Sequence, residues 1–165
     1  MTTVLVADDH QLLRQALRRA LEEGGVNVVT EACDGEEAVR LAHAQRPDVI
    51  VMDVTMPILD GIEATRQIYA DNSSARVVVL TMHDEDAILF DAIRSGAKGY
   101  LVKNVLLPDL LAAIKGVAHG EAAISPAMAG RILTEFTRLQ PVSVPEVPQT
   151  NGAEPIAYRQ GAQEI

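Results

Sequence analysis

Short runs of apolar, mostly β-branched residues alternate along the chain with longer segments in which apolar positions recur every three or four residues. Fully apolar runs of this length are typical of strands that are buried on both faces of a parallel sheet. A weaker strand is expected at about 26–30, where Asn27 interrupts the pattern. The alternation predicts an α/β protein with five strand–helix repeats. The four strongest runs are residues 4–7, 49–52, 77–80 and 100–102.

The segments between these runs carry helix start and stop signals. Asp34-Gly-Glu-Glu37 has the pattern of a capping box, in which Asp34 caps the helix and Glu37 reaches back. Pro108 opens another helix, for which the preceding Leu107 is a poor cap. Ser125-Pro126 predicts a sixth helix that continues to about Leu139. The other predicted helices cover about 11–23, 60–70 and a segment after 84–86 that ends at residue 96.

The composition changes after the sixth helix. Residues 141–165 contain four prolines, many polar residues and little apolar periodicity, which is typical of a flexible linker or tail. We therefore predict a folded domain over 1–122, a linker helix over 123–140 and a tail over 141–165.

Each of the four apolar runs ends in a polar residue. The endings are Asp8-Asp9, Asp53, Thr81 and Lys103. Open α/β sheets bind ligands beyond the carboxyl ends of their strands, so three carboxylates, a hydroxyl and an ammonium should meet there. Such a set can hold a divalent metal, accept a phosphoryl group and contact its oxygens.

Asp53 is the candidate nucleophile, because a carboxylate can attack phosphorus and form an acyl phosphate. The alternative is an ordinary aspartate that begins a loop. Clustered carboxylates repel one another unless a cation lies among them, and Mg²⁺ takes oxygen ligands and bridges to phosphate. We therefore predict a Mg²⁺ site at Asp8, Asp9 and Asp53. One of Asp8 and Asp9 has the alternative role of capping the first helix.

Other side chains near these strand ends allow two interpretations each. Lys103 suits a phosphoryl contact or an ordinary loop position, and Tyr100 suits a switch or plain packing. Gly61 permits a close approach of backbone segments. His10 is interpreted as a surface histidine, and Cys33 as a small buried residue.

Composition narrows the functional classes. The chain has 165 residues, is 48% hydrophobic and carries a net charge of −9, so we do not expect it to bind nucleic acid by itself. A single cysteine excludes an internal disulfide. No apolar run approaches the ~20 residues of a membrane helix, and the N-terminus lacks a signal-peptide pattern. We expect a cytoplasmic protein with no membrane partner.

The motifs together resemble the receiver domain of two-component response regulators, over about residues 1–120. The amino-acid sequence of residues 96–103 is similar to that of the NarL/LuxR-type subfamily. The matching segments are Val6-Ala-Asp-Asp-His10, Val51-Met-Asp-Val-Thr-Met-Pro-Ile-Leu-Asp-Gly61, Leu80-Thr-Met82 and Gly96-Ala-Lys-Gly-Tyr-Leu-Val-Lys103.

This resemblance implies a flavodoxin-like (CheY-like) doubly wound sheet of five parallel strands in the order 2-1-3-4-5, flanked by five helices. It also implies that a sensor histidine kinase phosphorylates Asp53. The chain itself would then not be an enzyme in the ordinary sense. The implied Mg²⁺ ligands are Asp9 directly, Asp8 mainly through water, Asp53, and the backbone carbonyl of Thr55. Thr81 and Lys103 would contact the phosphoryl group, and Tyr100 would be the switch aromatic.

Members of the subfamily normally carry a C-terminal helix-turn-helix domain, and nothing after residue 140 resembles one. The chain is therefore expected to be a truncated response regulator, which dimerises on phosphorylation and binds DNA only through the missing domain. One alternative is a stand-alone receiver that signals by protein contact. Another is a phosphatase of the haloacid dehalogenase type, which is disfavoured because Asp53-Val-Thr55 lacks the Asp-x-Asp pattern.

Overall fold

The computed structural model describes residues 1–82 and 84–139. The predicted tail over 141–165 lies outside the described residues. In chain order the elements are β1 (Thr3–Ala7), α1 (Gln11–Glu23), β2 (Asn27–Ala32), α2 (Gly35–Gln45), β3 (Val49–Asp53), α3 (Gly61–Asp71), β4 (Val77–Thr81), α4 (Asp86–Arg94), β5 (Gly99–Val102), α5 (Leu107–Ala118) and α6 (Pro126–Leu139).

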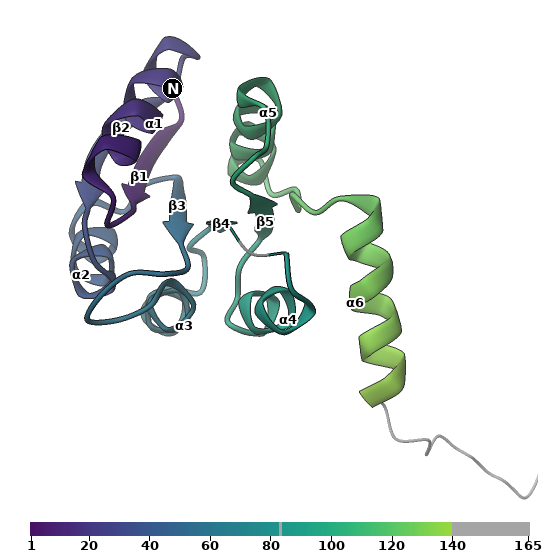
Figure 1. Ribbon diagram of the computed structural model, residues 1–165. Helices are drawn as coiled ribbons and strands as arrows, with labels where there is room; N and C mark the ends of the chain where they lie inside the picture. The colour runs from purple at the N-terminus through teal and green to yellow at the C-terminus, as the bar shows by residue number, and fades with distance from the viewer. Residues whose placement is uncertain (83, 140–165) are drawn as a thin grey trace, which may run out of the picture. The chain divides into compact units, whose positions relative to one another are not determined.

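The five strands form one parallel sheet in the order β2-β1-β3-β4-β5. The predicted fold class and strand order are therefore confirmed. In Figure 1, α1 and α5 lie on one side of the strands, and α2, α3 and α4 lie on the other. Helices on both faces explain why the strands are apolar along their whole length rather than alternating.

Alternate residues of the strands pack against different helices. Val4, Val6 and Val51 belong to a buried cluster with residues of α1 and α5. Neighbouring strand positions such as Leu5, Ile50 and Met52 point to the opposite face of the sheet and are also buried. This double burial fixes the strand register, because a shift by one residue would exchange the two faces.

Most predicted helix boundaries agree with the structure, and the differences have local causes. Asp34 caps α2 as expected, accepting from the N–H of Glu37, while the Glu37 carboxylate reaches back to the N–H of Cys33. Helix α5 begins one residue earlier than predicted, so its cap is Leu106 and not Leu107. Neither leucine has a polar atom that could accept a hydrogen bond. Strand β2 continues two residues beyond the predicted Thr30, to Ala32, because it keeps pairing with β1.

The chain divides into two compact units, 1–125 and 126–165. The sheet and its flanking helices belong to the first unit. The described part of the second unit is the single helix α6, on which Leu133, Phe136 and Leu139 are exposed. The sixth helix was predicted from Ser125-Pro126, and it begins at Pro126.

Replacing Gly61 by alanine should lower the free energy of unfolding by about 3 kcal/mol. A Cβ atom at Gly61 would overlap the backbone carbonyl oxygen of Asp53, and a buried strand cannot easily yield. Urea unfolding followed by circular dichroism measures the change. Gly130→Ala is the matched control, because a Cβ at Gly130 meets no neighbouring atom within 4 Å. Equal urea midpoints for the two variants would contradict the close approach.

Candidate functional site

The register of the sheet brings the polar strand endings together. Ala7 is paired with Met52, so Asp8 follows β1 beside Asp53, the last residue of β3. Thr81 is paired with Val102, so Lys103 follows β5 at the same edge, where its N–H donates to the carbonyl of Thr81 at 2.7 Å. The four segments therefore converge because parallel strands all end at one edge.

Lys103 lies between two carboxylates. Its Nζ is 3.0 Å from Oδ2 of Asp8 and 3.2 Å from Oδ1 of Asp53. The side chains of Lys103, Asp8 and Asp53 are only 12%, 3% and 8% exposed. These charges have little contact with solvent, so their attraction is screened far less than that of a surface pair.

The electrostatic balance at Asp53 is unfavourable to its negative charge. Burial is the main influence and raises the pKa of the Asp53 carboxyl above its ordinary value, and the charge of Asp8 raises it further. Lys103 acts in the opposite direction without cancelling these effects. For Lys103, burial disfavours the ammonium, but the hydrogen bond to Asp8 and the charge of Asp53 hold its pKa above the ordinary value. One ammonium therefore does not fully compensate the carboxylates.

These residues fit a divalent cation. Asp8, Asp9 and Asp53 each offer a carboxylate oxygen, and the three oxygens lie within 4.8 Å of one another. Asp9 is exposed, whereas Asp8 and Asp53 are buried, so the group opens to solvent on one side. Mg²⁺ prefers carboxylate oxygens together with several waters, and a cation here would relieve the repulsion that Lys103 leaves.

The remaining predicted residues are Thr81, Tyr100 and Thr55, and their roles stay predictions. Thr81 ends β4 and is fully buried. Tyr100 is also fully buried in β5 and takes the opposite face of the sheet from Leu101, which packs with the α1–α5 cluster. Thr55 is exposed in the segment between β3 and α3. In the same segment, Ile58 has a positive φ of 72°, which is rare for a β-branched residue.

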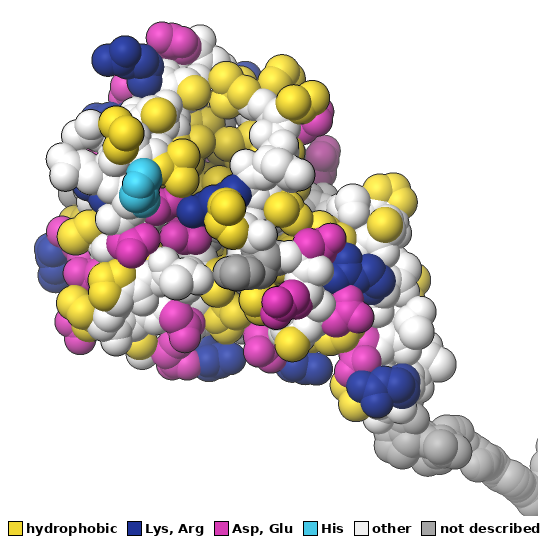
Figure 2. All heavy atoms as spheres, in the orientation of Figure 1, with side chains coloured by type: hydrophobic (Ala, Val, Ile, Leu, Met, Phe, Trp, Pro, Cys, Tyr) yellow, Lys and Arg dark blue, Asp and Glu magenta, His cyan; other side chains and the backbone are white. Residues whose placement is uncertain are grey.

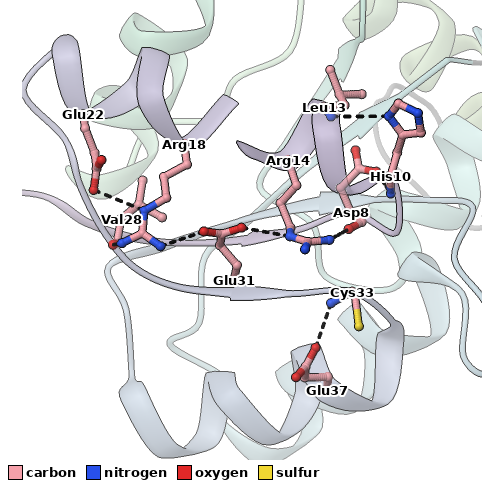
Figure 3. Close-up of polar contacts among 10 residues, drawn as sticks. All are labelled: Asp8, His10, Leu13, Arg14, Arg18, Glu22, Val28, Glu31, Cys33 and Glu37. Atoms are coloured by element: carbon pink, nitrogen blue, oxygen red, sulfur yellow. Dashed lines mark hydrogen bonds and ion pairs between the residues drawn. The ribbon is translucent and has the colours of Figure 1, made fainter. Parts of the chain in front are cut away.

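The roles of two residues near the site were not recognised from the sequence. His10 is exposed, as predicted, and its Nδ1 also accepts from the N–H of Leu13 and caps α1. Neither Asp8 nor Asp9 is the cap, and Oδ1 of Asp8 instead accepts from the N–H of His10. Arg14 donates to the backbone carbonyl of Asp8 at 2.7 Å (Figure 3). A polar residue directly before the helix was a usable signal for His10, whereas no local pattern in the sequence singles out Arg14.

A second group of potential ligands is explained by helix capping. Cys33, Asp34 and Glu37 have ligand atoms close together, but Asp34 and Glu37 accept backbone hydrogen bonds at the start of α2. Cys33 is exposed, so its predicted burial is wrong. It immediately follows the end of the edge strand β2. The hydrogen bond with Glu37 is the main cause that raises the pKa of its thiol, which keeps it protonated.

Exposed apolar side chains lie on the segments that follow four of the strands at the same edge of the sheet. Leu12, Ile58, Met82 and Leu106 are each at least 69% exposed, and they follow β1, β3, β4 and β5 respectively. On the described part of the face drawn in Figure 2, Lys and Arg side chains are scattered between acidic and hydrophobic ones. This distribution agrees with the net charge of −9 and differs from the basic surface of a nucleic-acid-binding domain.

Sequence comparisons agree with this arrangement. The family profile described as "Response regulator receiver domain" matches residues 4–115. The transcriptional regulatory protein DegU of Brevibacillus brevis is 39% identical over 137 residues, which are 82% of this chain and 58% of DegU. The response regulator GacA of Pseudomonas aeruginosa is 39% identical over 133 residues, which are 80% of this chain and 62% of GacA. The chain thus spans less than two thirds of these relatives.

Solved structures give the same result. A LuxR-family two-component response regulator from Aurantimonas sp. SI85-9A1 has a TM-score of 0.76 and 38% identity, covering 83% of this chain and 99% of that one. The receiver domain of the putative response regulator NarL from Mycobacterium tuberculosis has a TM-score of 0.70 and 38% identity, covering 73% of this chain and 98% of that one.

The chain belongs to the response regulator receiver family, whose members are typically not enzymes in the ordinary sense. Over the residues that the structure describes, no helix has the length and apolarity needed to span a bilayer.

Proposed function

We propose that this receiver domain accepts a phosphoryl group on Asp53 from a sensor histidine kinase and so controls an attached transcription-regulating domain. The supporting observation is the position of Asp53, 3.2 Å from Lys103 and grouped with Asp8 and Asp9 at the edge of the sheet. The carboxylate of Asp53 attacks phosphorus, and the bond from phosphorus to the donor breaks. Lys103 then pairs with the phosphoryl oxygens as a point charge. The domain thus assists its own phosphorylation without turning over an added substrate.

Mg²⁺ is the proposed cofactor. Asp9 would hold it directly and Asp8 mainly through water, and Asp53 and the backbone carbonyl of Thr55 would complete the protein ligands. When bound, it supplies positive charge that shields the phosphoryl oxygens from the acidic group. Asp8 and Asp9 place two further negative charges beside the nucleophile, so a phosphoryl dianion would be repelled strongly without a divalent cation.

The experiment is phosphorylation by a small phosphodonor, acetyl phosphate or phosphoramidate, followed by intact-mass measurement. With Mg²⁺ the chain should gain one phosphoryl group, and with excess chelator it should gain none. An adduct of equal amount in the chelator sample would contradict the metal requirement, and no adduct in either sample would contradict the proposed function.

Replacing Asp9 by alanine should weaken Mg²⁺ binding by roughly tenfold or more, because losing even an indirect contact of a metal site costs about that much. A Mg²⁺ titration followed by amide NMR shifts gives the dissociation constant. Glu23→Ala, an exposed carboxylate at the far end of α1, is the charge-matched control. Equal dissociation constants for the parent and the Asp9 variant would contradict the ligand assignment.

The kinase is proposed to dock on the edge that carries Leu12, Ile58, Met82 and Leu106. Single exposed apolar residues are ordinary, but these four lie on four different segments that follow strands at the edge where Asp53 ends β3. Phosphotransfer from a purified phosphohistidine kinase core to this chain tests the partner class. No transfer to the parent chain would contradict the partner class, and equal transfer to the Asp53→Asn variant would contradict Asp53 as the acceptor.

The proposed output is homodimerisation, which brings two attached DNA-binding domains into register. Relatives of about 40% identity are longer transcriptional regulators, which supports an effector domain after this chain. In the proposed switch, the hydroxyl of Thr81 moves toward the phosphoryl oxygens and Tyr100 changes its packing. A shift between two states needs about 3–5 kcal/mol, which two charge-assisted hydrogen bonds can supply. A cytoplasmic location is part of the same proposal, in line with the family.

Replacing Thr81 by alanine should leave phosphorylation intact and reduce dimerisation at least about fivefold, as expected if one hydrogen bond of ~1 kcal/mol to the phosphoryl group is lost. Sedimentation velocity with and without beryllofluoride and Mg²⁺ measures the dimer fraction. Thr137→Ala, in α6, is the control. If the Thr81 variant dimerises as readily as the parent, Thr81 does not couple phosphorylation to dimerisation.

A further inference from the structure

The backbone of Asp8 is held on both sides. Its N–H donates to the carbonyl of Ala32 in β2 at 3.0 Å. Its carbonyl accepts from Nη1 of Arg14 in α1 at 2.7 Å. The peptide unit is planar, so the Arg14 contact fixes the whole plane that runs from Asp8 to Asp9. Arg14 therefore controls the backbone from which both carboxylates of the acidic pair depart.

Arg14 is itself held in place. Its Nε donates to Oε1 of Glu31 in β2 at 2.9 Å, and Figure 3 shows the guanidinium between Glu31 and Asp8. The other oxygen of Glu31 accepts from Nη1 of Arg18 at 2.6 Å, and Arg18 also donates to the carbonyl of Val28 at 3.2 Å. The side chains of Arg14 and Glu31 are only 14% and 20% exposed, so this pair is more than a loose surface contact.

Glu31 stays ionised between the two arginines. Burial alone raises the pKa of its carboxyl, but the hydrogen bonds from Arg18 and Arg14 outweigh that effect and leave the pKa below its ordinary value. The ionised carboxylate orients Arg14, because a guanidinium has a rigid planar set of donors that matches such acceptors. The edge strand β2 is thereby connected to the acidic site through side chains.

We propose that Arg14 is a positioning residue for the metal site: together with Glu31 it sets the orientation of the Asp8–Asp9 peptide and thereby the geometry in which the acidic group binds Mg²⁺. This inference rests on the proposed function, which assigns Asp8 and Asp9 to the metal.

The sign of the effect separates positioning from simple charge. Arg14 is a cation near a cation site, so if only its charge mattered, removing it would strengthen Mg²⁺ binding. If Arg14 positions the carboxylates, removing it weakens binding, because the backbone carbonyl of Asp8 loses its donor and the peptide can rotate. Hydrogen bonds that orient the ligands of a metal in this way change metal affinity by roughly 10–100-fold.

The experiment compares the parent chain with Arg14→Met, Arg14→Lys and Arg18→Met. Mg²⁺ titrations followed by amide NMR shifts give dissociation constants, and thermal unfolding is measured separately so that titrations are run well below each melting temperature. The Arg14→Met variant should bind Mg²⁺ roughly tenfold more weakly. The Arg14→Lys variant keeps the charge but cannot contact Asp8 and Glu31 with the same fork, so it should lie between. The Arg18→Met variant loses an ion pair to the same Glu31 but leaves the Arg14–Asp8 contact, so its affinity should stay within about twofold of the parent.

Unchanged or tighter Mg²⁺ binding by Arg14→Met would overturn the inference, as would equal weakening in Arg14→Met and Arg18→Met. Lower melting temperatures with unchanged affinities would mean that Arg14 acts only on stability, which also overturns it. If the parent chain binds no Mg²⁺, the proposed function fails, and this inference fails with it. If the parent binds Mg²⁺ and only the Arg14 variants bind it more weakly, the inference stands.

Discussion

The Asp53→Asn variant should gain no phosphoryl group under conditions in which the parent chain becomes phosphorylated. The amide has no anionic oxygen to attack phosphorus, while its size keeps the buried environment intact. Asp8 should not replace the nucleophile, because its Oδ1 accepts from the N–H of His10 and its Oδ2 is bound to Lys103. Intact-mass measurement after incubation with acetyl phosphate and Mg²⁺ gives the adduct. Asp109→Asn, an exposed position in α5, is the matched control and should retain it.

The same substitution should make the protein more stable at neutral pH in the absence of Mg²⁺. The pKa of Asp53 is raised in the folded state, so the stability that its protonated form contributes is fully present below the unfolded value of about 3.9 and is lost as the pH rises through the folded value. Asparagine has no charge to lose. The melting temperature of Asp53→Asn should therefore exceed that of the parent at pH 7, and the difference should shrink toward pH 4. An undiminished phosphoryl adduct on Asp53→Asn would contradict the assignment of Asp53 as the nucleophile. A lower melting temperature of this variant than of the parent at pH 7 would contradict the unfavourable electrostatic balance at Asp53.

Replacing Lys103 by methionine should lower the free energy of unfolding by about 3 kcal/mol at pH 7 without Mg²⁺. The substitution leaves the carboxylates of Asp8 and Asp53 buried without their ammonium partner, 3.0 and 3.2 Å away in the parent. Loss of Lys103 also removes the influence that lowers the pKa of Asp53, so that pKa rises further. The penalty should therefore be largest at neutral pH and shrink as the pH falls toward the unfolded value of about 3.9. Urea unfolding between pH 4.5 and 7.5 measures it.

Two further variants sharpen this prediction. Lys115→Met removes a lysine of α5 whose Nζ donates to the backbone carbonyl of Gly24 at 3.3 Å, and it should cost less than about 1 kcal/mol. The double variant Lys103→Met/Asp53→Asn should recover part of the loss, because only Asp8 then remains unpaired. Saturating Mg²⁺ should also recover part of it by supplying positive charge to the same carboxylates. If Lys103→Met is as stable as Lys115→Met, the buried charge cluster does not act as described.

The sequence by itself determined the fold class, because each of its signals is local. An apolar run such as residues 49–52 is typical of a strand that is buried on both faces, and this indicates helices on both sides of a parallel sheet. The polar residue that ends each run then has a defined place at one edge of the sheet, so the approach of Asp8, Asp53 and Lys103 was predictable before any distance was known. Gly61 was likewise recognisable as a point of close backbone approach, and the structure gives the carbonyl of Asp53 as what it approaches.

Only the tertiary structure decided how these groups are held. The contacts of Arg14 join α1 to Asp8, which follows β1, and to Glu31 in β2. Arg14 and Glu31 are 17 positions apart, so no local pattern in either segment indicates the pair. The exposure of Cys33 at the end of an edge strand also depends on the strand order, which sets which strand has an uncovered side. The raised pKa of Asp53 depends on the burial and on the distances to Asp8 and Lys103. Sequence patterns specify which faces are buried, whereas the balance of charges depends on the separation of atoms that are far apart in the chain.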